Sequence, residues 1–114
     1  MISPVPFEIK TASLVDLGDL RKLEQLCFAR DAWPLFDLLG VLTFPGIVRY
    51  KAVVGECMAG FAAGERKPEE GRGWVTTIGV HPDYRRSGIG KALLATVEQA
   101  INMDHIRLCV RKNN

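Results

Sequence analysis

Residues 80–91 read VHPDYRRSGIGK, and the interpretation of the whole chain starts from this stretch. It follows WVTTIGV at 74–80, which has the composition of a strand, and it precedes ALLATVEQAI at 92–101, which has helical periodicity. Its glycines therefore fall where a strand passes into a helix. The first N–H groups of a helix have no partner inside it and carry the positive end of its dipole, so a phosphate can approach bare backbone there. We expect an anion site at this turn.

The sequence of the turn is more specific than a general phosphate-binding loop. Residues 85–90 (RRSGIG) fit the pattern Arg/Gln-x-x-Gly-x-Gly/Ala, with Val80 and Pro82 before them and a Leu-Leu pair after them. The dinucleotide fingerprint Gly-x-Gly-x-x-Gly is not met, because Leu93 stands at the third glycine position, and the chain has no Gly-Lys-Ser/Thr of a P-loop. In this context the stretch resembles the acyl-CoA-binding motif of the GNAT N-acetyltransferase superfamily.

The resemblance implies a site for acetyl-CoA as co-substrate. By resemblance, main-chain groups of Ile78 and Val80 pair with the pantetheine arm like an added strand, and the Val80 N–H faces the thioester oxygen. Gly79, between them, marks either a bulge, a close approach of another backbone, or relief of crowding in the sheet. The turn holds the pyrophosphate through its backbone and its cationic side chains. The expected coenzyme-binding residues are Ile78, Gly79, Val80, Arg85, Arg86, Ser87, Gly88, Ile89, Gly90, Lys91 and Asn114.

Neither general-base position of the resembled family carries a carboxylate here. In histone-acetylating relatives a Glu lies six residues before the last Val of the motif strand, a position that Trp74 takes. In relatives that modify ribosomal-protein N-termini a Glu lies five residues before a coenzyme-contacting Asn, which gives Cys109 if that Asn is Asn114. Glu65, Glu69, Glu70 and His81 lie near the motif as candidate bases, and Glu65 and His81 are the two put forward. The alternative interpretations are solvated loop glutamates, an exposed turn histidine, and a chain of waters that removes the proton.

The remaining catalytic groups are also missing from the pattern. The general-acid Tyr that is common in the family lies about seven residues beyond the Asn matched to Asn114, after the last residue of this sequence. Tyr84 is expected to pack. Cys109 has no His in a recognisable partnership, so a buried strand cysteine is favoured over a thiol nucleophile.

Three functions remain open at this point. The first is an N-acetyltransferase that moves an acetyl group from acetyl-CoA directly to a primary amine of a small molecule or protein. The second is a non-catalytic acyl-CoA-binding module, which the two replaced carboxylates favour. The third is a site for another phosphate ligand at Arg85, Arg86 and Lys91.

Composition sets broader limits. A chain of 114 residues, 47% hydrophobic and 25% charged, suits one domain over residues 1–114. The net charge of +2 gives little support to a nucleic-acid partner. Cysteines at 27, 57 and 109 fit neither a disulfide framework nor metal-ligand spacing, so no metal is expected. The chain shows no signal peptide and no apolar run of membrane-spanning length, so we expect a cytoplasmic protein without membrane contact.

The fold class that the pattern predicts is α/β, a single domain with a mixed, largely antiparallel sheet flanked by helices. Ser13 with Asp16 predicts the start of a helix that reaches about Arg30, and Trp33-Pro34 predicts the start of a second. Predicted strands cover 7–11, 47–54, 57–63, 74–80 and 106–111, and Gly64–Gly73 is predicted as a solvated loop. Relative to the family the C-terminal helix and last strands are missing, so we expect an open sheet edge that favours a homodimer or lowers stability.

Overall fold

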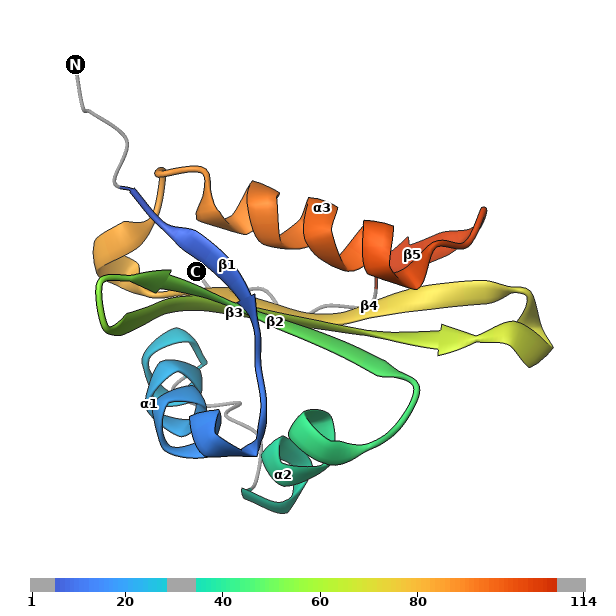
Figure 1. The fold of residues 1–114 in the computed structure, drawn as a ribbon, viewed down its shortest axis with the longest axis horizontal. Coiled ribbons are helices and arrows are strands. Elements are labelled where there is room, and N and C mark those ends of the chain that lie inside the picture. The colour runs from blue at the N-terminus through green and yellow to red at the C-terminus, as the bar shows by residue number, and fades with distance from the viewer. Residues whose placement is uncertain (1–5, 29–34, 109–114) are drawn as a thin grey trace.

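The strand-forming segments build one five-stranded sheet in the computed structural model, which describes residues 6–28 and 35–108 (Figure 1). The strands are β1 (Glu8–Thr11), β2 (Ile47–Val54), β3 (Cys57–Lys67), β4 (Arg72–Val80) and β5 (Ile106–Leu108). The helices are α1 (Leu17–Cys27), α2 (Leu35–Thr43) and α3 (Ile89–Ile101), with short 3₁₀ turns at Leu14–Asp16, Pro68–Glu70 and Pro82–Tyr84. The strands lie in chain order, antiparallel up to β4, and β5 is parallel to β4. The predicted mixed α/β fold is confirmed.

The two faces of the sheet carry separate apolar layers. Helices α1 and α2 cover one face and α3 covers the other (Figure 1). The central strand β3 is buried on both sides, because Phe61 and Ala63 belong to the α1 layer while Ala62 belongs to the α3 layer. A strand with both faces buried loses the alternation of apolar and polar residues, and β3 accordingly reads as a nearly continuous apolar run.

Helix α3 packs on the sheet through one stripe of side chains spaced four residues apart, which is one face of a helix. The stripe is Ile89, Leu93, Val97 and Ile101, each no more than 1% exposed. It lies against glycines of β3 and β4. A Cβ added to Gly64 would lie 2.8 Å from Val97 Cγ1, and one added to Gly73 would lie 2.3 Å from Ile101 Cγ2. The helix therefore sits so close to the sheet that these positions have no room for a side chain.

The start of the first helix is held by a buried acid. Ser13 donates its N–H to Asp16 Oδ2 at 2.9 Å, as the predicted cap requires, and Asp16 Oδ1 lies 2.6 Å from Lys51 Nζ. The first turn is 3₁₀ and the α-helix proper runs from Leu17 to Cys27, so it ends before the predicted Arg30. Because Lys51 lies on β2, the Asp16 carboxylate joins this helix to the sheet.

The hairpin between β3 and β4 is longer than predicted. The tight turn Gly55-Glu56 before β3 is confirmed, with Gly55 at φ +61° and Val54 paired with Cys57. The prediction of a loop over 64–73 is wrong, because β3 continues to Lys67 and β4 begins at Arg72. Glycines and charges in this segment are typical of loops, but Gly64 and Gly73 lie under α3, and only Gly71, at φ +70°, belongs to the turn between the strands.

Some predictions fall on residues outside the described ranges. They are the helix start at Trp33-Pro34, the last residues of the strand over 106–111, and the sites at Cys109 and Asn114. Helix α3 begins at Ile89, three residues before its periodicity becomes evident in the sequence.

No helix in the described ranges is long and apolar enough to cross a membrane.

Candidate functional site

One extra residue in β4 changes the face to which the strand's side chains point. Ala63 pairs with Thr77 and Gly64 pairs with Val75, so Thr76 is a bulge residue between the two pairs. Its Oγ1 donates to the Ala63 carbonyl at 3.1 Å. A bulge places two residues of one strand opposite one of its partner, and side chains beyond it exchange faces.

The bulge directs the end of β4 toward α3. Before it, Gly73 and Val75 face the α3 layer, and after it Ile78 and Val80 do. Gly79 then faces α1, in regular pairing with β3, and a Cβ there would lie 3.4 Å from Cys27 Sγ. The bulge is therefore not at Gly79, where side chains at the end of α1 approach the strand instead.

The main-chain groups of Val80 point away from β3. His81 donates its N–H to the Ala59 carbonyl at 2.7 Å, so this opposed pair is hydrogen-bonded. Hydrogen-bonded and non-hydrogen-bonded pairs alternate along an antiparallel ladder. The next pair, Val80 with Gly60, is therefore non-hydrogen-bonded, and Ile78, two residues earlier, has the same orientation. Both residues present their N–H and C=O groups on the side of β4 that faces away from β3.

The turn after β4 prepares the start of α3. Arg86 and Gly88 both have positive φ, at +65° and +86°, and the Ser87 hydroxyl donates to the Tyr84 carbonyl. Gly88 is the N-cap of α3, and the first helical bond runs from the Ala92 N–H to the Gly88 carbonyl at 3.0 Å. Helix geometry leaves the preceding N–H groups, those of residues 89–91, without a partner in the helix, so they are available as donors to an anion.

A cavity of about 390 Å³ lies between the end of β4 and the start of α3. Its lining residues are Ile78, Val80, Tyr84, Arg85, Arg86, Gly88, Ile89, Gly90 and Lys91. Eight of these nine are among the residues expected to bind coenzyme. Three expected residues remain. Gly79 and Ser87 are each next to lining residues in the sequence but do not line the cavity themselves. Asn114 lies outside the described ranges. The cavity joins an apolar strand end to three cationic side chains and a helix N-terminus.

Tyr84 is the lining residue that the sequence pattern missed. It was expected only to pack, and its one sequence signal is its place immediately before Arg85. Its ring meets the His81 ring edge to face, with centroids 5.4 Å apart. The Cys57 thiol, through its negative charge at high pH and its hydrogen bond, raises the pKa of Tyr84 above the ordinary value of 10.0. The phenol is therefore neutral at physiological pH.

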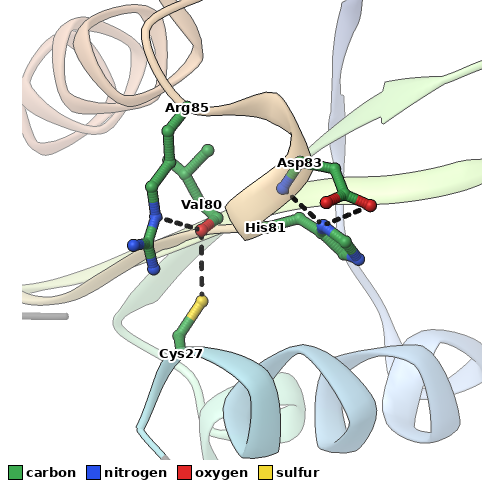
Figure 2. Close-up of polar contacts among 5 residues, drawn as sticks. All are labelled: Cys27, Val80, His81, Asp83 and Arg85. Atoms are coloured by element: carbon green, nitrogen blue, oxygen red, sulfur yellow. Dashed lines mark hydrogen bonds and ion pairs between the residues drawn. The ribbon is translucent and has the colours of Figure 1, made fainter. Parts of the chain in front are cut away.

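The candidate base His81 lies beside the turn, away from the lining of this cavity. Its Nδ1 accepts the Asp83 N–H at 3.1 Å and lies 3.9 Å from Asp83 Oδ2 (Figure 2). The imidazole lines a second, smaller cavity of about 240 Å³ on the α1 side of the sheet, together with Cys57. Its contacts with Asp83 make His81 part of the turn after β4.

The other candidate, Glu65, lies directly opposite Trp74 in the β3–β4 register. Directly opposed side chains share a face of the sheet, with Cβ atoms about 5 Å apart. The Glu65 carboxylate is 35% exposed and pairs with Lys67 Nζ at 3.4 Å. Trp74 Nε1 is buried and has no hydrogen-bond partner within the described part of the chain. The structure thus places the Glu65 carboxylate next to Trp74, the position at which the resembled family carries a general-base Glu.

Known proteins share the sequence pattern and the fold of this chain. Residues 19–114 match the profile described as Acetyltransferase (GNAT) family. The chain is similar to ribosomal-protein-alanine N-acetyltransferase from Brucella melitensis biovar Abortus 2308, with TM-score 0.72, 25% identity, and coverage of 93% of this chain and 82% of that one. It is also similar to ribosomal-protein-S18-alanine N-acetyltransferase from Escherichia coli, with TM-score 0.74, 22% identity, and coverage of 84% of this chain and 59% of that one.

A third solved structure contains the coenzyme. It is the PaiA N-acetyltransferase from Thermoplasma acidophilum in complex with coenzyme A, with TM-score 0.74, 18% identity, and coverage of 84% of this chain and 72% of that one. No curated protein sequence matches the chain.

Proposed function

The chain belongs to the GNAT acetyltransferase family, and from this we propose that it transfers an acetyl group from acetyl-CoA directly to a primary amine of a small molecule or protein. The observation that supports the proposal best is the cavity between β4 and α3, where Arg85, Arg86 and Lys91 meet the N-terminus of α3. Cationic side chains and free helix N–H groups together suit a pyrophosphate.

The residues present fit the coenzyme in a further respect. A Cβ added to Gly90 would contact only Val80 Cγ2, at 3.5 Å, and one added to Gly88 would meet nothing within 4 Å. The helix start therefore carries no side chain at two of its first positions, which lets a ligand approach its backbone. We assign the pyrophosphate to this turn and the pantetheine arm to the main-chain groups of Ile78 and Val80, which point away from β3.

For the proton of the acceptor amine we propose Glu65 as general base. It lies on the strand next to β4, opposite Trp74, and its carboxylate is partly exposed. A carboxylate is a group that commonly serves as general base, and that of Glu65 lies 3.4 Å from Lys67 Nζ. His81 is less suited, because its Nδ1 already accepts the Asp83 N–H.

The alternative is a non-catalytic acyl-CoA-binding module, and one observation favours it. The strand position nearest to Glu65 is filled by an indole whose Nε1 is buried. An indole cannot accept a proton from an amine. If Glu65 serves only its ion pair with Lys67, the site holds coenzyme without activating an acceptor.

Two measurements separate these functions. Titration calorimetry with acetyl-CoA should show binding in either case, and absence of binding at high micromolar coenzyme removes both. Release of free CoA, followed with a thiol reagent in the presence of amines, should occur only with an enzyme. The first amine to test is a peptide with an N-terminal alanine, because two similar structures are ribosomal-protein-alanine acetyltransferases.

A further inference from the structure

The carbonyl oxygen of Val80 has two donors, one from α1 and one from the turn after β4 (Figure 2). Cys27 Sγ lies 3.3 Å from this oxygen, and Arg85 Nε also lies 3.3 Å from it. A carbonyl oxygen has two lone pairs, so both are occupied in this arrangement. The occupied oxygen belongs to one of the two residues that we assign to the pantetheine arm.

The two donors are held in different ways. Cys27 is the last residue of α1, only 7% exposed, and the missing side chain of Gly79 allows its close approach. Arg85 is exposed and lines the cavity beside Arg86 and Lys91. Its contact with Val80 is at the long end for an N–H···O bond. Packing therefore fixes the thiol, whereas one weak hydrogen bond holds the guanidinium.

A phosphate is a stronger partner for a guanidinium than a carbonyl is. Both contacts have an ionised donor, but a phosphate also carries the opposite charge and can accept two parallel N–H bonds from the guanidinium. The cavity already offers a phosphate two further cations and the N-terminus of α3. A phosphate that binds the Nε edge of Arg85 in such a bidentate pair competes with the Val80 carbonyl for the Nε–H.

We propose that Arg85 couples the two halves of the coenzyme site. In the free protein its Nε blocks one lone pair of the Val80 carbonyl. When the pyrophosphate draws the guanidinium away, that lone pair becomes available to an amide N–H of the pantetheine arm. Cys27 remains bonded and keeps the carbonyl in its orientation. The proposal rests on the proposed function, because it requires the coenzyme to lie along β4.

The coupling is measured with the two halves of the coenzyme as separate ligands. Reduced pantetheine is titrated into ¹⁵N-labelled protein with and without saturating 3′-phospho-ADP, and the affinity is taken from backbone amide shifts. We expect 3′-phospho-ADP to raise the affinity for pantetheine about fivefold, the value of one neutral hydrogen bond. The Arg85 Nε–H resonance should move when 3′-phospho-ADP alone is added, and an unmoved resonance would overturn the proposal.

Variants of Arg85 and Arg86 distinguish the effect of the Arg85–Val80 bond from the effect of losing one positive charge in the cavity. In Arg85→Ala we expect weaker binding of 3′-phospho-ADP but tighter binding of pantetheine, which no longer depends on the nucleotide. The matched control is Arg86→Ala, since Arg86 lines the same cavity and, within the described residues, no bond joins its side chain to Val80. It should weaken 3′-phospho-ADP and leave the fivefold coupling intact. Weaker pantetheine binding in Arg85→Ala would contradict the proposal.

Failure of this proposal is distinct from failure of the proposed function. If wild-type protein binds neither whole CoA nor 3′-phospho-ADP, the coenzyme site itself is wrong. If it binds whole CoA while pantetheine affinity is indifferent to the nucleotide, the site stands and the role of Arg85 as a coupling residue is refuted.

Discussion

Asp16 Oδ1 lies 2.6 Å from Lys51 Nζ, and the two side chains are only 7% and 20% exposed. The same carboxylate accepts the Ser13 N–H, so it serves both the helix start and the sheet. Removing one partner of a buried pair leaves the other charge uncompensated. We expect Asp16→Ala to lower the free energy of unfolding in urea by about 3 kcal/mol. Glu8→Ala is the control, because its 3.8 Å pair with Lys10 is exposed, and a loss of equal size there would contradict the explanation.

The close packing of α3 on the sheet predicts different outcomes for two glycines. Gly73→Ala would place a Cβ 2.3 Å from Ile101 Cγ2, in a core without space for it. We expect a loss of stability of about 2 kcal/mol or more, seen as a lower midpoint of urea unfolding. Gly18→Ala, on the exposed side of α1 with nothing within 4 Å, should instead gain about 0.5 kcal/mol. Equal tolerance of both substitutions would show that α3 lies farther from β4 than described.

The two glycines of the turn should also differ. Gly88 has φ +86° and caps α3, so Gly88→Ala should cost about 1 kcal/mol of backbone strain and weaken binding of acetyl-CoA. Gly90 lies inside the helix, and its added Cβ would make only an ordinary contact with Val80. Gly90→Ala should therefore fold at least as well as wild type. Thermal unfolding with and without coenzyme tests both variants, and a more damaging Gly90→Ala would contradict this view.

Glu65→Gln tests the proposed general base. If Glu65 accepts the proton, kcat should fall about a hundredfold while binding of acetyl-CoA is unchanged, because the carboxylate acts on the acceptor amine. The acid-side fall in the pH profile of kcat/KM should disappear as well. Glu69→Gln, on the exposed Pro68–Glu70 turn, should behave as wild type. An unchanged pH profile in Glu65→Gln would assign proton removal to another group.

The contact between Tyr84 and Cys57 makes the stability of the protein depend on pH in the alkaline range. Because Cys57 raises the pKa of Tyr84, the folded protein retains the phenolic proton at a pH where the unfolded chain loses it. The stabilisation from this contact is present below pH 10.0 and is lost as the pH rises through the folded-state pKa. Cys57→Ala should lower the pKa of Tyr84 toward its ordinary value. Ultraviolet titration in a Tyr50→Phe background, which leaves Tyr84 as the single tyrosine, measures it.

The sequence was informative where local chemistry determines structure. The glycines of the turn, the cap at Ser13 and the hairpin at Gly55 each carry a local backbone requirement, and the elements around them were predicted. The prediction of a loop over 64–73 was wrong because Gly64 and Gly73 leave room for α3, which comes later in the sequence. Such a requirement cannot be read from neighbouring residues.

The same distinction applies to the candidate site. The cationic turn could be found from its own residues, whereas Glu65 opposite Trp74 depends on an unpredicted extension of β3. The bond from Cys27 to Val80 joins residues 53 positions apart. The bulge at Thr76 leaves little trace in sequence, because two adjacent threonines suit either face of a strand.

The bulge at Thr76 also determines how β4, whose Ile78 and Val80 line the cavity, tolerates a change in its length. It divides β4 into two parts. Odd-numbered residues face α3 in the part that begins at Arg72, and even-numbered residues face α3 in the part that begins at Thr77. Deleting Thr76 would leave the remaining β3–β4 pairs in regular register, with Ile78 and Val80 still on the α3 side, whereas straightening the strand with Thr76 retained would carry both residues to the α1 side. The strand therefore tolerates a one-residue deletion at the bulge, whereas a deletion after it, at Gly79, would move the Val80 side chain to the α1 side.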